Sequence, residues 1–179
     1  QVSQPYYIFQ TASGLLADEE TVDAGLKLLE RAFDAFPSHR NYLTQNIRNE
    51  SIWRNDRFYQ FAKRAALPTP QDIRSNPWIG LNQINSYSGN GEVNVFFHQM
   101  LQGLKSTDKL DDLENSIKTL LDQQPGWHSG RAMLALLELA TDRKAEAQAR
   151  LTALLEDDAI SKSMPAEACW IIGQELDRF

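Results

Sequence analysis

The residues best suited to metal binding or nucleophilic catalysis are few and lie far apart in the chain. No two of the three histidines, His39, His98 and His128, have the i, i+4 spacing of a metal-binding pair, and the single cysteine, Cys169, is near none of them. The spacing therefore predicts no metal site. A Cys/His nucleophile pair is the alternative, but Cys169 lies among apolar residues of an expected helix. We expect its thiol to be buried and inert.

Two pairs of neighbouring acids and one glycine-rich turn complete the candidate chemistry. Asp111 with Asp112, and Asp157 with Asp158, lie near expected helix ends. We interpret them as solvated helix termini, because the pKa values of a general acid/base pair separate only on burial. The Ser-Gly-Asn-Gly turn at residues 88–91 lacks the flanking strand and helix of a phosphate-binding loop. The sequence thus predicts no catalytic residue and no cofactor.

The middle of the chain is basic, although the chain as a whole carries a net charge of −6. Residues 39–74 hold seven Lys and Arg against three acids, so +7 − 3 gives +4. Bases interleaved with aromatic residues can bind single-stranded nucleic acid or an acidic peptide, but the total charge argues against nucleic acid. The alternative is a helix whose basic outer face docks on the acidic flanks of the chain. His98, outside this segment, is expected to face a groove or solvent.

Apolar residues recur at helical spacing along most of the chain, which predicts an all-α fold. The expected helices cover residues 6–16, 18–36, 52–66, 93–104, 110–124, 128–140 and 144–156, with a short one at 42–47 and a last one that Ser163 caps and that has Pro165 in its first turn. No alternation with period two is long enough to predict a strand. Residues 68–92 are rich in proline and glycine and are predicted to form a long irregular loop.

Two apolar stripes superpose at one offset, because 147 − 113, 151 − 117 and 154 − 120 all equal 34. The matching pairs are Leu113 and Ala147, Ile117 and Leu151, and Leu120 and Leu154. Stacked helical hairpins leave a fixed offset of this size, since one hairpin cannot bury its own stripe. We therefore predict one domain, with a first hairpin at 6–38, an irregular helical insert at 39–92 and stacked hairpins at 93–179.

Two 34-residue windows also share large and small residues at the same positions. The window from Tyr6 has Phe9, Ala12, Ser13, Leu16, Gly25, Leu29, Ala32 and Pro37, and that from Asn94 has Phe97, Met100, Leu101, Leu104, Leu113, Ile117, Leu120 and Pro125. This pattern resembles the tetratricopeptide repeat in degenerate form. The resemblance covers residues 6–38 and 94–179.

The later units depart from this pattern. A third unit fits only after a one-residue slip, which places Ala132, Ala135, Leu136 and Leu139 at buried positions instead of Arg131 and Glu138. A fourth half-unit has Cys169, Ile172, Gly173 and Leu176 at those positions. The small residues Ser13 and Gly173 would let helices approach closely.

The resemblance implies a non-catalytic protein–protein interaction or scaffolding domain, whose first helices line a groove for an extended peptide of a partner protein. Carried over by position, the groove residues are Tyr7, Gln10, His98, Gln102 and Lys105. The alternative function is an enzyme or ligand-binding accessory domain, with a pocket between the middle segment and the repeats. Such a pocket would be lined by Arg54, Arg57 or Trp78.

The ends of the chain carry two further expectations. Leu176 and Phe179 would leave an apolar end open, which predicts either more chain there or self-association through the C-terminal helix. The chain begins at Gln1, so we expect a processed form or a piece of a longer protein. No apolar run reaches the roughly 20 residues that a membrane span needs.

Overall fold

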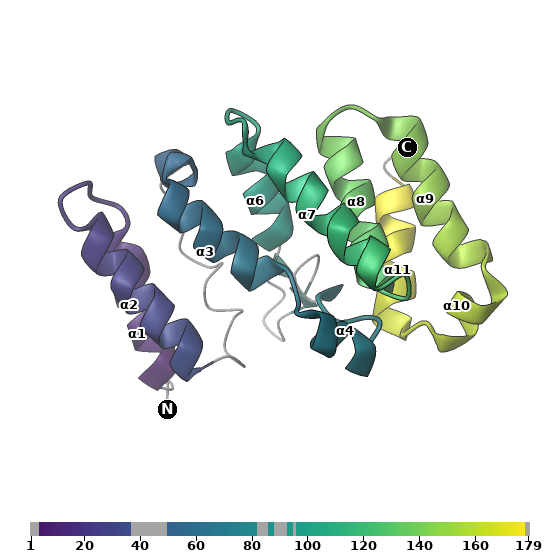
Figure 1. The fold of residues 1–179 in the computed structure, drawn as a ribbon, viewed down its shortest axis with the longest axis horizontal. Helices are drawn as coiled ribbons and strands as arrows, with labels where there is room; N and C mark the ends of the chain where they lie inside the picture. The colour runs from purple at the N-terminus through teal and green to yellow at the C-terminus, as the bar shows by residue number, and fades with distance from the viewer. Residues whose placement is uncertain (1–3, 37–49, 82–85, 88–92, 95, 178–179) are drawn as a thin grey trace.

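The computed structural model describes residues 4–36, 50–81, 86–87, 93–94 and 96–177 (Figure 1). Its helices are α1 (Gln4–Leu15), α2 (Val22–Ala35), the 3-10 helix η2 (Glu50–Arg54), α3 (Asp56–Ala66), α4 (Pro70–Ser75), α6 (Phe96–Leu104), α7 (Lys109–Gln123), α8 (His128–Ala140), α9 (Lys144–Glu156), α10 (Asp158–Ser163) and α11 (Ala166–Leu176). Strands β1 (Ser86–Tyr87) and β2 (Val93–Asn94) form one short antiparallel pair. Apart from this pair, whose strands have two residues each, every regular element of the described residues is a helix, so the all-α prediction is confirmed. None of the described helices is long and apolar enough to cross a membrane.

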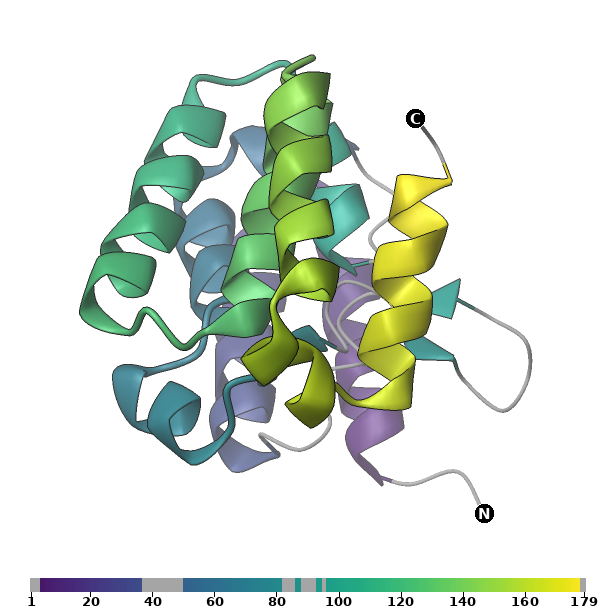
Figure 2. The same cartoon turned by 90° about the vertical axis from the view of Figure 1, so that its right-hand side faces the viewer.

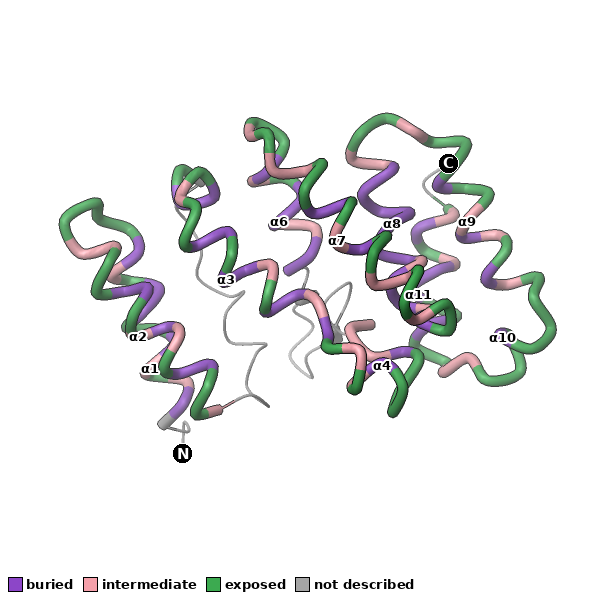
Figure 3. Tube along the Cα trace, viewed as in Figure 1, coloured by how far each residue is buried: buried purple, intermediate pink, exposed green. Residues whose placement is uncertain are grey.

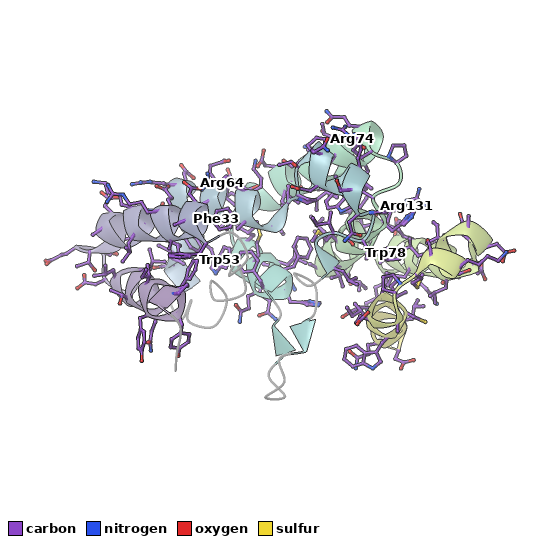
Figure 4. The ribbon with its side chains drawn as sticks, turned by 90° about the horizontal axis from the view of Figure 1, so that it is seen from below. Phe33, Trp53, Arg64, Arg74, Trp78 and Arg131 are labelled. Atoms are coloured by element: carbon purple, nitrogen blue, oxygen red, sulfur yellow. The ribbon has the colours of Figure 1, made fainter. Side chains whose placement is uncertain are left out.

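The helices lie on two sides of the molecule. In two views, α2, α3 and α7 lie on one side and α1, α6 and α11 on the other (Figures 2 and 4). Short turns connect α1 to α2, α7 to α8 and α8 to α9, and the helices of each pair pack against each other. Helix α6 also packs against α8, so residues 96–156 form a contiguous body.

The residues that carry the 34-residue offset face the core. Leu113 and Ile117 on α7 are buried, as are Ala147, Leu151 and Leu154 on α9, while Leu120 is half-buried. Between these helices, α8 is buried nearly all round, because α6, α7 and α9 all pack against it (Figure 3). Ala132, Ala135 and Leu136, which the slip places at buried positions, are buried and Leu139 is half-buried, but all residues from 132 to 138 are buried, so the slip stays a prediction. Glu138, which the slip was meant to expose, is buried as well.

The predicted loop at residues 68–92 is wrong at its start, where α4 forms. Thr69 and Asp72 make a capping box, in which Thr69 Oγ1 accepts from the Asp72 amide at 3.2 Å and Asp72 Oδ2 accepts from the Thr69 amide at 3.1 Å. Pro70 at the first helical position costs no hydrogen bond. The prediction of a helix from 93 is also wrong at its first residues, since β2 covers Val93–Asn94 and α6 begins at Phe96.

Two other boundaries differ because side chains start helices at unpredicted positions. Asn55 accepts a hydrogen bond from the Phe58 amide at 3.0 Å and so divides the predicted helix at 52–66 into η2 and α3. Asp157 accepts from the Ala159 and Ile160 amides at 2.9 and 3.1 Å and starts α10, which was not predicted. The expectations for His39, for the helix at 42–47, for the turn at 88–91 and for Phe179 lie outside the described residues.

The predicted register of the last helix is wrong by one residue. The buried residues of α11 are Ala168, Ile171, Ile172 and Glu175, so Cys169 is exposed rather than buried. The 34-residue count did not allow for α10, which lies between α9 and α11. This extra helix shifts by one residue the positions of α11 that face the core. Gly173 is not a close-approach site, since a Cβ there would meet nothing within 4 Å. The tight α1–α2 contact is at Gly25, where a Cβ would lie 3.0 Å from Leu15 Cβ.

Two helical glycines give a matched stability prediction. At Gly130 on α8 an added Cβ would lie 2.1 Å from Cε3 of the buried Trp127 ring, whereas Gly173 on α11 has open space. Gly130→Ala is expected to lower the free energy of unfolding by about 1–3 kcal/mol, because the packed indole must shift. Gly173→Ala is expected to raise it by about 0.5–1 kcal/mol through helix propensity alone. Urea unfolding followed by far-UV circular dichroism measures both, and equal effects would contradict the packing at Gly130.

Candidate functional site

The predicted groove residues lie on the side of the molecule formed by α1, α6 and α11. Tyr7 and Gln10 are on α1, His98 and Gln102 are on α6, and Lys105 directly follows α6. All except His98 are exposed, and 56% of the Tyr7 surface is accessible. Helix α1 lies at one end of the molecule and α6 near its middle, so the two sets of residues are separated along the long axis (Figure 1).

His98 is not the solvent-facing residue that the sequence predicted. Its side chain is only 22% exposed, and Nε2 lies 3.4 Å from Glu175 Oε1 on α11. Glu175 itself is 4% exposed. This contact connects α6 to the C-terminal helix and places a carboxylate and an imidazole side by side beneath the surface. Glu175 was not predicted to be buried, because the one-residue register error assigned the buried position to Leu176.

The same side carries a second aromatic residue, Trp170 on α11. Tyr7 and Trp170, at 56% and 44% exposure, are the exposed large hydrophobic residues of the described part of the chain. Aromatic side chains present a large contact area with little conformational entropy to lose, and they are enriched at protein-binding surfaces. With the amides of Gln10 and Gln102, this side offers apolar area and hydrogen-bonding groups to a partner.

On the other side, the basic residues of the middle segment dock on α2. Arg57 Nη2 lies 2.8 Å from Glu30 Oε2, and this hydrogen bond raises the pKa of the guanidinium. Arg64 lies 3.4 Å from Asp34 and places its guanidinium carbon 5.2 Å from the centre of the Phe33 ring (Figure 4). Docking on an acidic flank is therefore confirmed for Arg57 and Arg64, which connect α3 to α2.

A second polar contact connects α3 to α7. The Tyr59 hydroxyl donates to Asp112 Oδ2 at 2.5 Å, and Lys63 Nζ lies 2.7 Å from the same oxygen. The hydrogen bond from Lys63, followed by that from Tyr59, lowers the pKa of Asp112. Burial and the hydrogen bond to Asp112 raise the pKa of Tyr59. Asp111 and Asp112 are both exposed in the first turn of α7, as predicted, but the contacts of Asp112 with Tyr59 and Lys63 were not predicted.

Two buried carboxylates hold α7, α8 and α9 together. Glu114 on α7 accepts two hydrogen bonds from Arg143, at 2.9 and 2.6 Å, and its Oε1 lies 2.6 Å from Lys118 Nζ. These partners, Arg143 first, lower the pKa of Glu114 to about 2. Glu138 on α8 accepts from Arg150 Nη2 at 2.7 Å. Arg143 directly precedes α9 and Arg150 lies in the middle of that helix, so charge pairing fixes the position of α9 against the other helices.

The residues proposed to line a pocket in the middle segment do not converge. Arg54 is exposed on η2, Arg57 binds Glu30 on α2, and Trp78 is buried against His128 at the start of α8. Within the described ranges, no group of three or more His, Cys, Asp or Glu could hold a metal ion. Comparison of the chain with protein-family models, with curated proteins and with solved structures found no match.

Proposed function

We propose that this chain is a non-catalytic protein–protein interaction or scaffolding domain that binds an extended peptide along the side formed by α1, α6 and α11. The observation that carries the proposal is the placement of the exposed aromatics. Tyr7 and Trp170 lie on α1 and α11, and these helices flank α6 on one side of the molecule (Figure 2). Gln10, Gln102 and Lys105 supply exposed polar groups on the same side.

The distribution of charged residues supports this choice of side. On the side of α2, α3 and α7, several arginines and lysines join one helix to another, as Arg57 does with Glu30 and Lys63 with Asp112. These side chains stabilise the helix packing and are less available to a ligand. The α1, α6 and α11 side instead presents aromatic and amide groups, which suit an uncharged, extended peptide backbone.

We further propose that the helical pairs are degenerate units of the tetratricopeptide type. The buried stripes of α7 and α9 repeat at an offset of 34 residues, and α7, α8 and α9 pack successively against one another. In such a stack, the first helices of successive pairs line a common face, which is the arrangement that the peptide-binding role requires. Self-association through α11 stays a prediction, which light scattering at micromolar concentration tests.

A peptide selection tests the proposed function without a known partner. The full chain is used to select from a displayed library of random 12-residue peptides, and a selected peptide is then titrated by fluorescence anisotropy. We expect Tyr7→Ala, Gln102→Ala and Trp170→Ala each to weaken binding, with at least a tenfold loss when two are combined. Lys27→Ala on α2 and Asn115→Ala on α7 are matched controls, because both residues are exposed and belong to helices on the other side.

Two outcomes would contradict the proposal. One is a selection that enriches no sequence above the background of an immobilised unrelated protein. The other is a peptide whose affinity falls in the Lys27 and Asn115 variants but not in those of Tyr7, Gln102 and Trp170.

A further inference from the structure

The first turn of α8 is capped by a distant part of the chain. The His128 amide donates to the Pro77 carbonyl at 2.9 Å, and Trp127 Nε1 donates to the Ile79 carbonyl at 3.0 Å. No side chain caps α8, so the turn at residues 76–81 takes the place of an N-cap residue. These two hydrogen bonds dock the turn on the helix and keep Trp127 fully buried.

His128 lies in the middle of this junction. Its ring centre is 5.1 Å from that of Trp78, with the two planes tilted by 52°. His128 Nδ1, Trp78 Nε1 and Ser129 Oγ are all buried without a hydrogen-bond partner. The closed junction therefore leaves several polar groups without hydrogen bonds. A modest further increase in the free energy of the closed form can favour its opening.

Protonation of His128 adds such a penalty. The imidazolium carries a hydrogen on both nitrogens, so the buried Nδ1–H would be a charged donor with no acceptor. The positive end of the α8 dipole and the guanidinium of Arg131, one turn along, both oppose the charge, while Asp157 before α10 favours it. Burial is the largest influence and Arg131 the next, and together they lower the pKa of His128 below its ordinary value.

We propose that His128 is a pH-sensitive lock, which in its neutral form holds the turn at residues 76–81 on α8 and on protonation releases it. The release exposes Trp78 and removes the cap from α8. This device is independent of the proposed peptide-binding role, since it lies at the junction of α4 and α8. Burial, Arg131 and Asp157 together set the pH at which the lock opens. Trp78 and Arg131 both lie in this part of the molecule (Figure 4).

The sign of the pH dependence follows from proton linkage. Above about pH 6.5, the ordinary pKa of histidine, His128 is neutral in both forms and the junction stays closed. Below this pH the open form, with His128 in water, binds the proton more readily than the closed form. The equilibrium constant for opening then rises by at most tenfold per pH unit, as expected for one proton, until the closed form is protonated too.

Hydrogen exchange of the Trp127 indole N–H tests the lock, because this group is bonded to the Ile79 carbonyl. We expect its protection factor, corrected for intrinsic exchange, to fall up to tenfold per unit between pH 6.5 and 5. His128→Gln should abolish this fall. His98→Gln, which changes another half-buried histidine, should retain it. The amide of Leu151, buried on α9, reports global unfolding and should keep its protection.

Three results would overturn the proposal. They are an unchanged protection factor in the wild-type chain, the same fall in His128→Gln, and a parallel fall at Leu151. Should His128→Gln fail to fold, nuclear magnetic resonance titration of the His128 ring in the wild-type chain decides the matter. A midpoint below about 6.5 is expected, and a midpoint at or above that value contradicts the lock.

Discussion

Trp127→Ala is expected to lower the free energy of unfolding by about 3–5 kcal/mol, the usual cost of truncating a buried tryptophan. Trp127 has no exposed surface, packs against Gly130 and donates its indole N–H to the Ile79 carbonyl. The substitution removes the apolar contacts and leaves that carbonyl without its partner. Urea unfolding followed by far-UV circular dichroism measures the change.

Trp170→Ala is the matched control for this prediction. The same atoms are removed from a side chain that is 44% exposed, so a much smaller loss is expected, on the order of 1 kcal/mol or less. Comparable losses in the two variants would mean that Trp127 does not anchor the 76–81 turn to α8.

Arg150→Met is expected to destabilise the chain by about 3 kcal/mol, because it leaves the Glu138 carboxylate buried without its cationic partner. Glu138 is 3% exposed and accepts from Arg150 at 2.7 Å. The double variant Glu138→Leu/Arg150→Met is expected to recover most of that loss, since apolar residues of similar volume can replace a buried ion pair. Urea unfolding of the two variants and of Glu138→Leu forms a double-mutant cycle.

An exposed ion pair provides the control for this cycle. Lys162 and Asp158 lie 3.8 Å apart on α10 with most of both side chains in solvent. Lys162→Met should change stability by less than about 0.5 kcal/mol. An Arg150→Met effect of that size would show that the Glu138 carboxylate is solvated.

The sequence predicts the fold best where stop signals bound a strong apolar period. The expected helices at 128–140 and 144–156 coincide with α8 and α9, and α2 ends before Pro37 as predicted. Leu113 and Ile117, taken from the 34-residue offset, are buried. A periodic stripe and a proline are local features, so they can be read from a short window of residues.

The sequence predicts less well where distant residues decide the structure. The one-residue slip moved Glu138 away from the buried positions, yet its carboxylate is buried and Arg150, twelve residues on, satisfies it. Capping side chains also altered boundaries, as Asn55 did between η2 and α3. The capping box at Thr69 and Asp72 was readable from the sequence, but the surrounding prolines favoured a loop prediction.

The exposure of the candidate-site residues agrees in part with the sequence prediction, while their peptide-binding role stays a prediction. Tyr7, Gln10, Gln102 and Lys105 are exposed as the groove prediction requires, but His98 is half-buried and lies against Glu175. Trp170 and Glu175 were missed because α10 shifts the register of α11 by one residue. A fixed offset of 34 residues identifies the buried positions of the next unit only when the connections between the helices have equal length.

The Pro77 carbonyl at the start of α8 limits how this chain can be divided. In an array of independent hairpins, a cut between two units leaves both halves structurally complete. Here a segment spanning only 96–177 would keep every residue of α8 yet lack the carbonyl oxygens of Pro77 and Ile79 that bind it. The contact between the 76–81 turn and α8 therefore belongs to both parts of the chain, and circular permutants or truncations that break it are expected to destabilise the fold.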